Sequence, residues 1–171
     1  MESASARASG VGRDRPFEAV GFLISQLGFQ SSRRFAERLE PLELNPRTFA
    51  LLRHIEAAEG EPQHALAEAL HVPPSRMVAL LDELEERGLV ERRPHPTDRR
   101  ARSLYLTRSG RRLLERAKKI AAEHEAELCA DLTAAERKNL MELLGRVAAS
   151  QGLIRGVHPA IDLKVSGPPA D

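Results

Sequence analysis

The chain has no tryptophan, only one tyrosine and five phenylalanines, and a single cysteine, Cys129. One cysteine excludes a disulfide framework within the chain. Apolar runs of the ~18 residues that a membrane-spanning helix needs are also missing. Residues 1–15 lack the hydrophobic segment of a signal peptide, so we expect a cytoplasmic protein. Cys129 itself is expected to be a small buried helical residue, with redox sensing as the alternative.

An excess of charge of one sign is absent as well. The 26 Lys and Arg residues face 25 Asp and Glu residues, for a net charge of +1. The distribution is uneven, however, because residues 91–112 hold eight arginines and only two acidic residues. A basic segment on a near-neutral chain suits local phosphate contact, although a charge run alone can also be a solvated surface.

Apolar spacing and helix-capping residues predict a mostly helical chain. Six helical segments begin near Pro16, Pro46, Glu61, Pro74, Thr107 and Thr133. Asn45 before Pro46 is a favourable N-cap, and Thr133 with Glu136 forms a capping box. Residues 1–15 read as a disordered arm, and residues 151–171 form a tail whose order the pattern does not decide.

The stretch from Pro74 to Thr107 is the most informative part of the sequence. A helix ends at Gly88, an apolar strand starts at Leu89, and the alternating run 104–106 returns after an arginine-rich loop. Preceded by a short helix and a tight turn at residues 71–73, this order predicts a winged helix-turn-helix. The expected fold is therefore mainly α with a small β-hairpin.

This architecture can place its second helix in a major groove and its loop in the adjoining minor groove. Arg76, in the first turn, could donate two hydrogen bonds to a guanine, whereas Val78 and Ala79 offer only apolar contact. Asp98 is expected to brace the loop by pairing with Arg100 or Arg102, and Arg108 to contact the DNA backbone with Arg92 and Arg93. The predicted DNA-binding residues are Ser75, Arg76, Val78, Ala79, Arg92, Arg93, Arg99, Arg100 and Arg102.

The long terminal helices carry more apolar surface than a small winged core can cover, which favours burial against a second copy. We accordingly expect a domain at residues 16–150. Its DNA-binding lobe spans about 45–107, and its dimerisation helices span about 16–40 and 107–150. A dimer can set two recognition helices one helical turn apart on palindromic DNA.

The run from Leu66 to Gly110 resembles the MarR family of bacterial transcriptional regulators. The matching segments are Leu66-Ala67, the run LLDELEERGLVER at residues 80–92, DRRA at 98–101, LYLT at 104–107, and Gly110. The order of six helices extends the resemblance to roughly residues 17–149. It implies a homodimeric regulator of palindromic operator DNA, usually a repressor that a small phenolic or anionic ligand releases. Family recognition helices often carry Thr or Arg where this chain has Val78 and Ala79.

The resemblance also implies a ligand pocket between the dimerisation helices and the DNA-binding lobe. Aromatic side chains with one arginine would suit an aromatic carboxylate, although these aromatics can equally be core residues. The candidates are Phe22, Gln26, Phe29, Gln30, Arg33, Phe49 and His54. The lack of tryptophan gives no support to a urate-type site.

Other functions receive less support from the sequence. The family's peroxide sensors carry a reactive cysteine near the N-terminal helix, and here Cys129 lies far from it. The six histidines lack a metal-ligand spacing, so we expect no metal and no cofactor. No nucleotide-binding glycine loop or nucleophile elbow appears, which argues against an enzyme. A winged-helix module that binds protein instead of DNA remains an alternative, as does regulation through Cys129.

Overall fold

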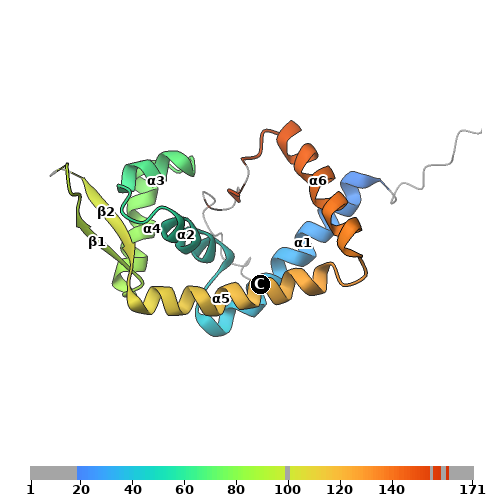
Figure 1. Ribbon diagram of the computed structural model, residues 1–171, viewed down its shortest axis with the longest axis horizontal. Helices are drawn as coiled ribbons and strands as arrows, with labels where there is room; N and C mark the ends of the chain where they lie inside the picture. Colours follow the sequence, from blue (N-terminus) through green and yellow to red (C-terminus); the bar gives the residue numbers. More distant parts are fainter. Residues whose placement is uncertain (1–18, 99–100, 155, 159–160, 162–171) are drawn as a thin grey trace, which may run out of the picture.

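The computed structural model describes residues 19–98, 101–154, 156–158 and 161, and Figure 1 shows their arrangement. α5 (Arg108–Leu128) runs along one side of the molecule and joins its two ends. One end is a lobe of α2 (Pro46–Ala57), α3 (Gln63–Ala69), α4 (Pro74–Glu86), β1 (Val90–Pro94) and β2 (Arg102–Leu106). The other end holds α1 (Val20–Leu39) and α6 (Ala134–Ser150). The expected mainly helical fold with a small hairpin is confirmed.

The helix starts follow from local capping. The Asn45 side chain accepts a hydrogen bond from the Thr48 amide at 2.8 Å, and Thr107 Oγ1 accepts one from the Gly110 amide at 3.0 Å. Thr133 and Glu136 form the predicted capping box. The hydrogen bonds from Thr133 lower the pKa of the Glu136 carboxyl. A cap needs only neighbouring residues, which is why these three starts are readable from sequence.

The N-terminal helix ends just before Pro41, close to the expected end near residue 40. α1 ends at Leu39, and a short 3₁₀ helix, Glu40–Leu42, carries Pro41 before the chain turns at Glu43 with φ of 53°. A 3₁₀ turn accepts proline near its start because the missing N–H would have no partner there.

The wing is an antiparallel pair whose register runs from Val90 opposite Leu106 to Pro94 opposite Arg102. The segment before α3 adds to it, since the Gly60 amide donates to Leu104 O at 3.0 Å and the Leu104 amide donates to Glu61 O at 3.1 Å. Gly60 has φ of 89°, a conformation that favours glycine. The hairpin is thereby attached to the chain leading into the helix-turn-helix.

One apolar core holds the lobe to α5 and the end of α1. It contains Leu39, Leu51, Leu52, Ile55, Met77, Leu81, Leu84, Leu104 and Leu114, all at most 2% exposed. Ile161 joins this core at 2% exposure, so part of the C-terminal tail packs on the domain. The expected disordered arm and most of the remaining tail lie outside the described residues.

The end formed by α1 and α6 is different, because it exposes apolar side chains. α6 buries none of its residues within the chain. The exposed apolar residues of the two helices are Val20, Phe22, Leu23, Ile24, Leu27, Phe29, Leu140, Met141, Leu143, Leu144 and Val147. None of the helices in the described part of the chain is long and apolar enough to cross a membrane.

Candidate nucleic-acid interface

α4 presents the side chains that the sequence predicts to read DNA. Its inner face buries Met77, Leu81 and Leu84. Because the helical period puts the other residues outward, Ser75 and Ala79 are exposed and Val78 is 41% exposed. Arg76 is half-buried. The first turn of α4 has no side-chain cap. Amides at such a helix start favour anions such as phosphate.

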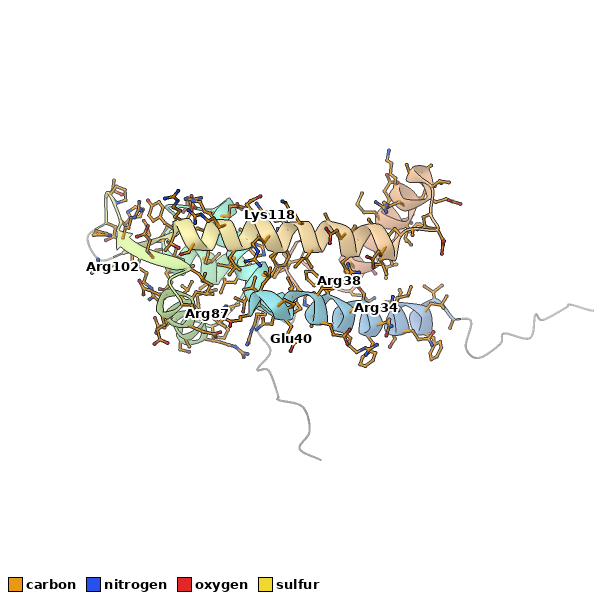
Figure 2. All side chains as sticks on the ribbon, turned by 90° about the horizontal axis from the view of Figure 1, so that it is seen from below. Arg34, Arg38, Glu40, Arg87, Arg102 and Lys118 are labelled. Carbon is orange, nitrogen blue, oxygen red and sulfur yellow. The ribbon has the colours of Figure 1, made fainter. Side chains whose placement is uncertain are left out.

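The wing carries two of the predicted arginines on its surface. Arg93 is exposed, pairs with Glu91 at 2.5 Å, and places its guanidinium 4.5 Å from the centre of the Tyr105 ring. Arg102 is also exposed and lies on the hairpin at the end of the molecule (Figure 2). Stacking on Tyr105 orders Arg93 without removing its charge from the surface.

Arg92 occupies a different position from its neighbours. Its side chain is only 17% exposed and points back onto α4. There it pairs with Asp82 at 2.6 Å and with Glu85, and its Nε donates to Gln63 Oε1 at 3.1 Å. The expected contact of Arg92 with the DNA backbone therefore competes with three protein side chains.

The wing loop contains an organising histidine that sequence reasoning missed. His95 Nδ1 accepts hydrogen bonds from the amides of Thr97 at 3.3 Å and Asp98 at 3.2 Å. The amide of Ala101 donates to Asp98 O at 3.1 Å. Arg99 and Arg100 lie outside the described residues, and with them the expected pairing of Asp98 with Arg100. The available signal was a histidine between two prolines, Pro94 and Pro96, with Thr97 and Asp98 directly after them.

Ion pairs join α5 to the lobe and to α1. Lys118 of α5 contacts Glu56 of α2 at 2.7 Å, and Arg38 of α1 pairs with Glu127 of α5. Figure 2 shows Arg38 and Lys118 in the middle of the molecule, away from Arg102 at the hairpin. The hydrogen bond with Arg38 lowers the pKa of the Glu127 carboxyl.

A cavity of about 530 Å³ lies between α1, α2 and α5. It combines aromatic rings with charged groups: His124 stacks on Phe35 at 5.3 Å, and Phe35 meets Phe49 edge-on at 5.5 Å. Ser31 Oγ lies 2.9 Å from His124 Nε2. The lining residues are Phe35, Phe49, Arg53, Lys118, Ala121, Ala122, His124 and Glu125.

The seven residues predicted to bind a ligand are not brought together. Phe49 is the only one of them among the residues that line this cavity. Phe22, Gln26 and Phe29 lie on the exposed N-terminal half of α1. Arg33 is exposed and pairs with Glu37 at 3.2 Å.

His54 lies apart from the cavity, near the returning C-terminal tail. Burial lowers the pKa of its imidazole, and so does the nearby charge of Arg53, whereas a hydrogen bond with the Gly156 backbone opposes the shift. His54 therefore helps to hold the tail on α2.

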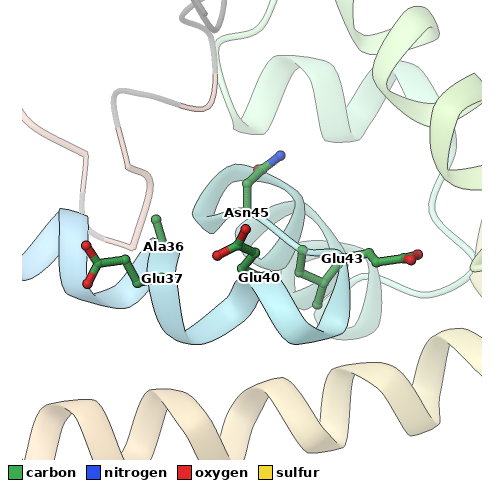
Figure 3. Close-up of a pocket in the computed structure, with 6 residues that line it drawn as sticks. Ala36, Glu37, Glu40, Glu43 and Asn45 are labelled. Atoms are coloured by element: carbon green, nitrogen blue, oxygen red, sulfur yellow. The ribbon is translucent and has the colours of Figure 1, made fainter. Parts of the chain in front are cut away.

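A second hollow of about 460 Å³ lies where α1 turns into α2 (Figure 3). Its rim includes the carboxylates of Glu37, Glu40 and Glu43. Like charges would repel an anionic ligand from this hollow. Across the described residues, no group of three or more His, Cys, Asp or Glu side chains is arranged to hold a metal ion.

Comparison with known proteins supports the interpretation of the lobe. The family model for the MarR family matches residues 42–101. A protein of Thauera aromatica, provisionally named a transcriptional regulatory protein for the hcr operon, is 33% identical over 129 residues. The match spans 75% of this chain and 78% of that relative.

Solved structures give the same family. MarR of E. coli in its apo form has a TM-score of 0.63 and 31% identity, over 75% of this chain and 96% of that chain. The transcriptional repressor CouR bound to a 23-mer DNA duplex has a TM-score of 0.69 and 35% identity, over 77% of this chain and 93% of that chain. CouR from Rhodococcus jostii bound to p-coumaroyl-CoA has a TM-score of 0.64 and 32% identity, over 77% of this chain and 92% of the CouR chain. The chain thus belongs to the MarR family of DNA-binding transcriptional regulators.

Proposed function

We propose that the chain is a homodimeric repressor that reads operator DNA through α4 and the wing. The observation that carries this proposal is the juxtaposition of two exposed elements in the lobe. α4 presents Ser75 and Arg76 in its first turn, and the hairpin presents Arg93 and Arg102 on its surface. CouR, which is described as a transcriptional repressor bound to DNA, offers a precedent for the repressor role.

The proposed contacts divide by task. Arg76 reads a base edge, Ser75 contacts a phosphate or a base, and Val78 and Ala79 make apolar contact with thymine methyl groups. Arg102 enters the minor groove next to α4, together with the loop arginines Arg99 and Arg100. Arg93 and Arg108 contact phosphates, and Asp98 braces the loop.

The dimer is supported by the apolar faces of α1 and α6. Within one chain these faces contain exposed residues such as Leu27 at 57% and Leu143 at 55%. Exposed apolar residues gathered on two helices favour burial in a protein interface. A second copy would cover them and set two lobes on the two halves of a palindrome.

We expect Arg76→Ala and Arg102→Ala to weaken DNA binding in different ways. Loss of a base contact by Arg76 costs about 1–3 kcal/mol and relaxes sequence preference under α4. Loss of Arg102 weakens binding more evenly across sequences and lowers the salt dependence. Fluorescence anisotropy would measure the affinity of each variant over a range of salt concentrations. The DNA would be a duplex that the wild-type protein selects from a random library, together with single-base variants of that duplex.

Lys119→Ala provides the matched control, because it removes one positive charge from an exposed position on α5. It should leave both affinity and base preference close to wild type. Unchanged base preference in Arg76→Ala, with preference altered instead in Arg102→Ala, would contradict the assigned tasks.

We further propose that the cavity between α1, α2 and α5 binds an aromatic carboxylate as effector. Phe35 and Phe49 offer apolar ring surface, and Arg53 offers a cation. Lys118 already contacts Glu56 and Glu115, whereas Arg53 has no carboxylate partner among the described residues. The ligand carboxylate would face Arg53 and point away from Glu125. The complex of CouR with p-coumaroyl-CoA is a precedent for an aromatic ligand in a related protein.

This location also supplies a route to DNA release. α2 belongs to the DNA-binding lobe, while α1 and α5 continue toward the proposed dimer interface. A ligand that binds one lobe orientation better than another shifts the population toward that orientation. The lobe orientation sets the spacing of the two recognition helices.

We expect p-coumarate or a related aromatic acid, such as benzoate or 4-hydroxybenzoate, to stabilise the wild-type protein. At a ligand concentration ten times Kd the gain is about 1.4 kcal/mol, which raises Tm by about 3–6 °C. Arg53→Ala should abolish the shift in a thermal-shift assay. Arg33→Ala should retain it, because Arg33 does not line the cavity. The absence of a shift with every acid, or its loss in Arg33→Ala instead, would contradict this site.

Redox control through Cys129 is less well supported. The cysteine is 8% exposed within one chain, and reactive sensor cysteines need access to the oxidant.

A further inference from the structure

Arg92 connects three elements of the DNA-binding lobe. It projects from β1, and its guanidinium reaches Asp82 Oδ1 at 2.6 Å and Glu85 on α4, and Gln63 Oε1 at 3.1 Å at the start of α3. A further contact to Val78 O is 3.5 Å long. Four hydrogen bonds occupy most of the five N–H donors that a guanidinium has. The Arg92 amide also donates to Glu85 Oε1 at 3.3 Å.

The surroundings of Arg92 differ from those of a phosphate-binding arginine. Its side chain is 17% exposed, whereas the side chain of the adjacent Arg93 is 56% exposed. Two carboxylates already balance its charge. A phosphate would have to displace these carboxylates, and no gain in net charge complementarity would result.

The two carboxylate partners of Arg92 lie where negative charge would weaken DNA binding. Asp82 and Glu85 lie on the recognition helix, where uncompensated carboxylates would repel the DNA backbone. Both are bound by a side chain that comes from the wing. A planar guanidinium fixes the direction of each bond, so the contact defines the orientation of β1 relative to α4 more closely than an ammonium could.

We propose that Arg92 is a positioning residue that couples the wing to the recognition helix. It holds β1 against α4 and α3, so that helix and wing meet the two DNA grooves as one rigid unit. It also neutralises Asp82 and Glu85 on the helix that faces DNA. Arg92 therefore contributes to operator affinity without contacting the DNA.

The test compares four variants and one combination of them in the full chain, with affinity measured by anisotropy on a wild-type-selected duplex over a range of salt concentrations. Arg92→Gln removes the charge, and Arg92→Lys keeps the charge but not the planar fork. The double change Asp82→Asn with Glu85→Gln removes the partners. The double change Glu83→Gln with Glu86→Gln is the control, since it removes two exposed carboxylates of the same helix that are outside the contacts of Arg92.

We expect Arg92→Gln and Arg92→Lys each to lower affinity at least tenfold, with the salt dependence of binding unchanged. Removing Asp82 and Glu85 should give binding at least fivefold weaker than in the control variant, which should bind as well as wild type or better. Adding Arg92→Gln to the Asp82 and Glu85 variant should cost little more, because the coupling between wing and helix is already broken.

A phosphate contact by Arg92 would produce the opposite pattern. Arg92→Lys would then bind nearly as wild type, and Arg92→Gln would lower the salt slope by about 0.9 for each phosphate that Arg92 neutralises. The double change Asp82→Asn with Glu85→Gln, which frees Arg92, would then strengthen DNA binding as much as the control change at Glu83 and Glu86 does. Any of these results, or a lower Tm with unchanged affinity of the folded protein, would overturn the proposal. If Arg92→Gln does not fold, the variants of the exposed Asp82 and Glu85 decide.

These outcomes are separate from failure of the proposed repressor function. If the repressor function fails, the wild-type protein selects no duplex from the library, and no affinity can be compared among the variants.

Discussion

Gly110→Ala should destabilise the protein by about 3 kcal/mol or more, which lowers Tm by about 10 °C. A Cβ placed on Gly110 would lie 2.0 Å from Leu89 O and 2.9 Å from its carbonyl carbon. These atoms belong to backbone, so they cannot move aside as a flexible side chain would. Relief requires the first turn of α5 to shift away from the start of β1.

The hydrogen bonds around Gly110 show why such a shift is costly. The Thr107 amide donates to Leu89 O at 3.1 Å, and both Thr107 Oγ1 and Ser109 Oγ donate to Gly88 O, at 2.6 and 2.8 Å. These bonds attach α5 directly to the turn between α4 and the wing. Moving α5 would weaken all of them and disturb the packing of the wing on the recognition helix.

Gly145→Ala is the matched control, because none of the described residues places an atom within 4 Å of a Cβ there. In a helix interior alanine is favoured over glycine by about 1 kcal/mol, so Tm should rise slightly. Thermal unfolding followed by circular dichroism would measure both variants. Equal Tm values for Gly110→Ala and wild type would contradict the close packing of Gly110 on Leu89.

Leu27→Glu should convert the protein to a monomer and reduce operator affinity at least 100-fold. Leu27 lies on α1 and is 57% exposed within one chain, so the change costs little in an isolated protomer. In the proposed dimer the same position is buried, and an unpaired carboxylate there is strongly unfavourable. Losing the second lobe removes an effective-concentration gain of about 10²–10⁴.

Sedimentation velocity would report the mass, and anisotropy would report the affinity. Lys119→Gln serves as the control, since it changes the net charge by the same amount at an exposed position on α5 outside the apolar faces. A dimeric Leu27→Glu protein with wild-type affinity would show that α1 does not form the proposed interface.

The parts of the fold that depend on neighbouring residues were predictable. Asn45, Thr107 and Thr133 begin helices because the side chain of each accepts a hydrogen bond from the amide three residues ahead. The wing was equally readable, since its two strands are separated by a short loop. The order of helices and strands followed from these local signals together with apolar periodicity.

Contacts between distant segments could not be read in the same way. In the sequence, Gly110 stands out only as a glycine in the first turn of a helix. The structure shows why a side chain does not fit there: the carbonyl of Leu89, 21 positions earlier, occupies the space. Arg92 looked like one more arginine in a basic run, whereas its carboxylate partners lie on another element.

The effector site illustrates the same limit. Phe22 and Phe29 share α1 with Phe35, and periodicity alone does not decide which part of a long helix meets α2. The structure places Phe35 on the cavity, together with Phe49 and His124 from other helices. The first half of α1 extends beyond the lobe, as Figure 1 shows.

The most direct test of the central claim is a selection from a random-sequence duplex library with the wild-type protein. The enriched duplex should carry an inverted repeat with half-sites about one helical turn apart. It should bind two chains, with an affinity that falls steeply between about 50 and 200 mM salt. Failure to enrich any sequence, or binding that does not respond to salt, would contradict the assignment of α4 and the wing as a DNA-reading surface.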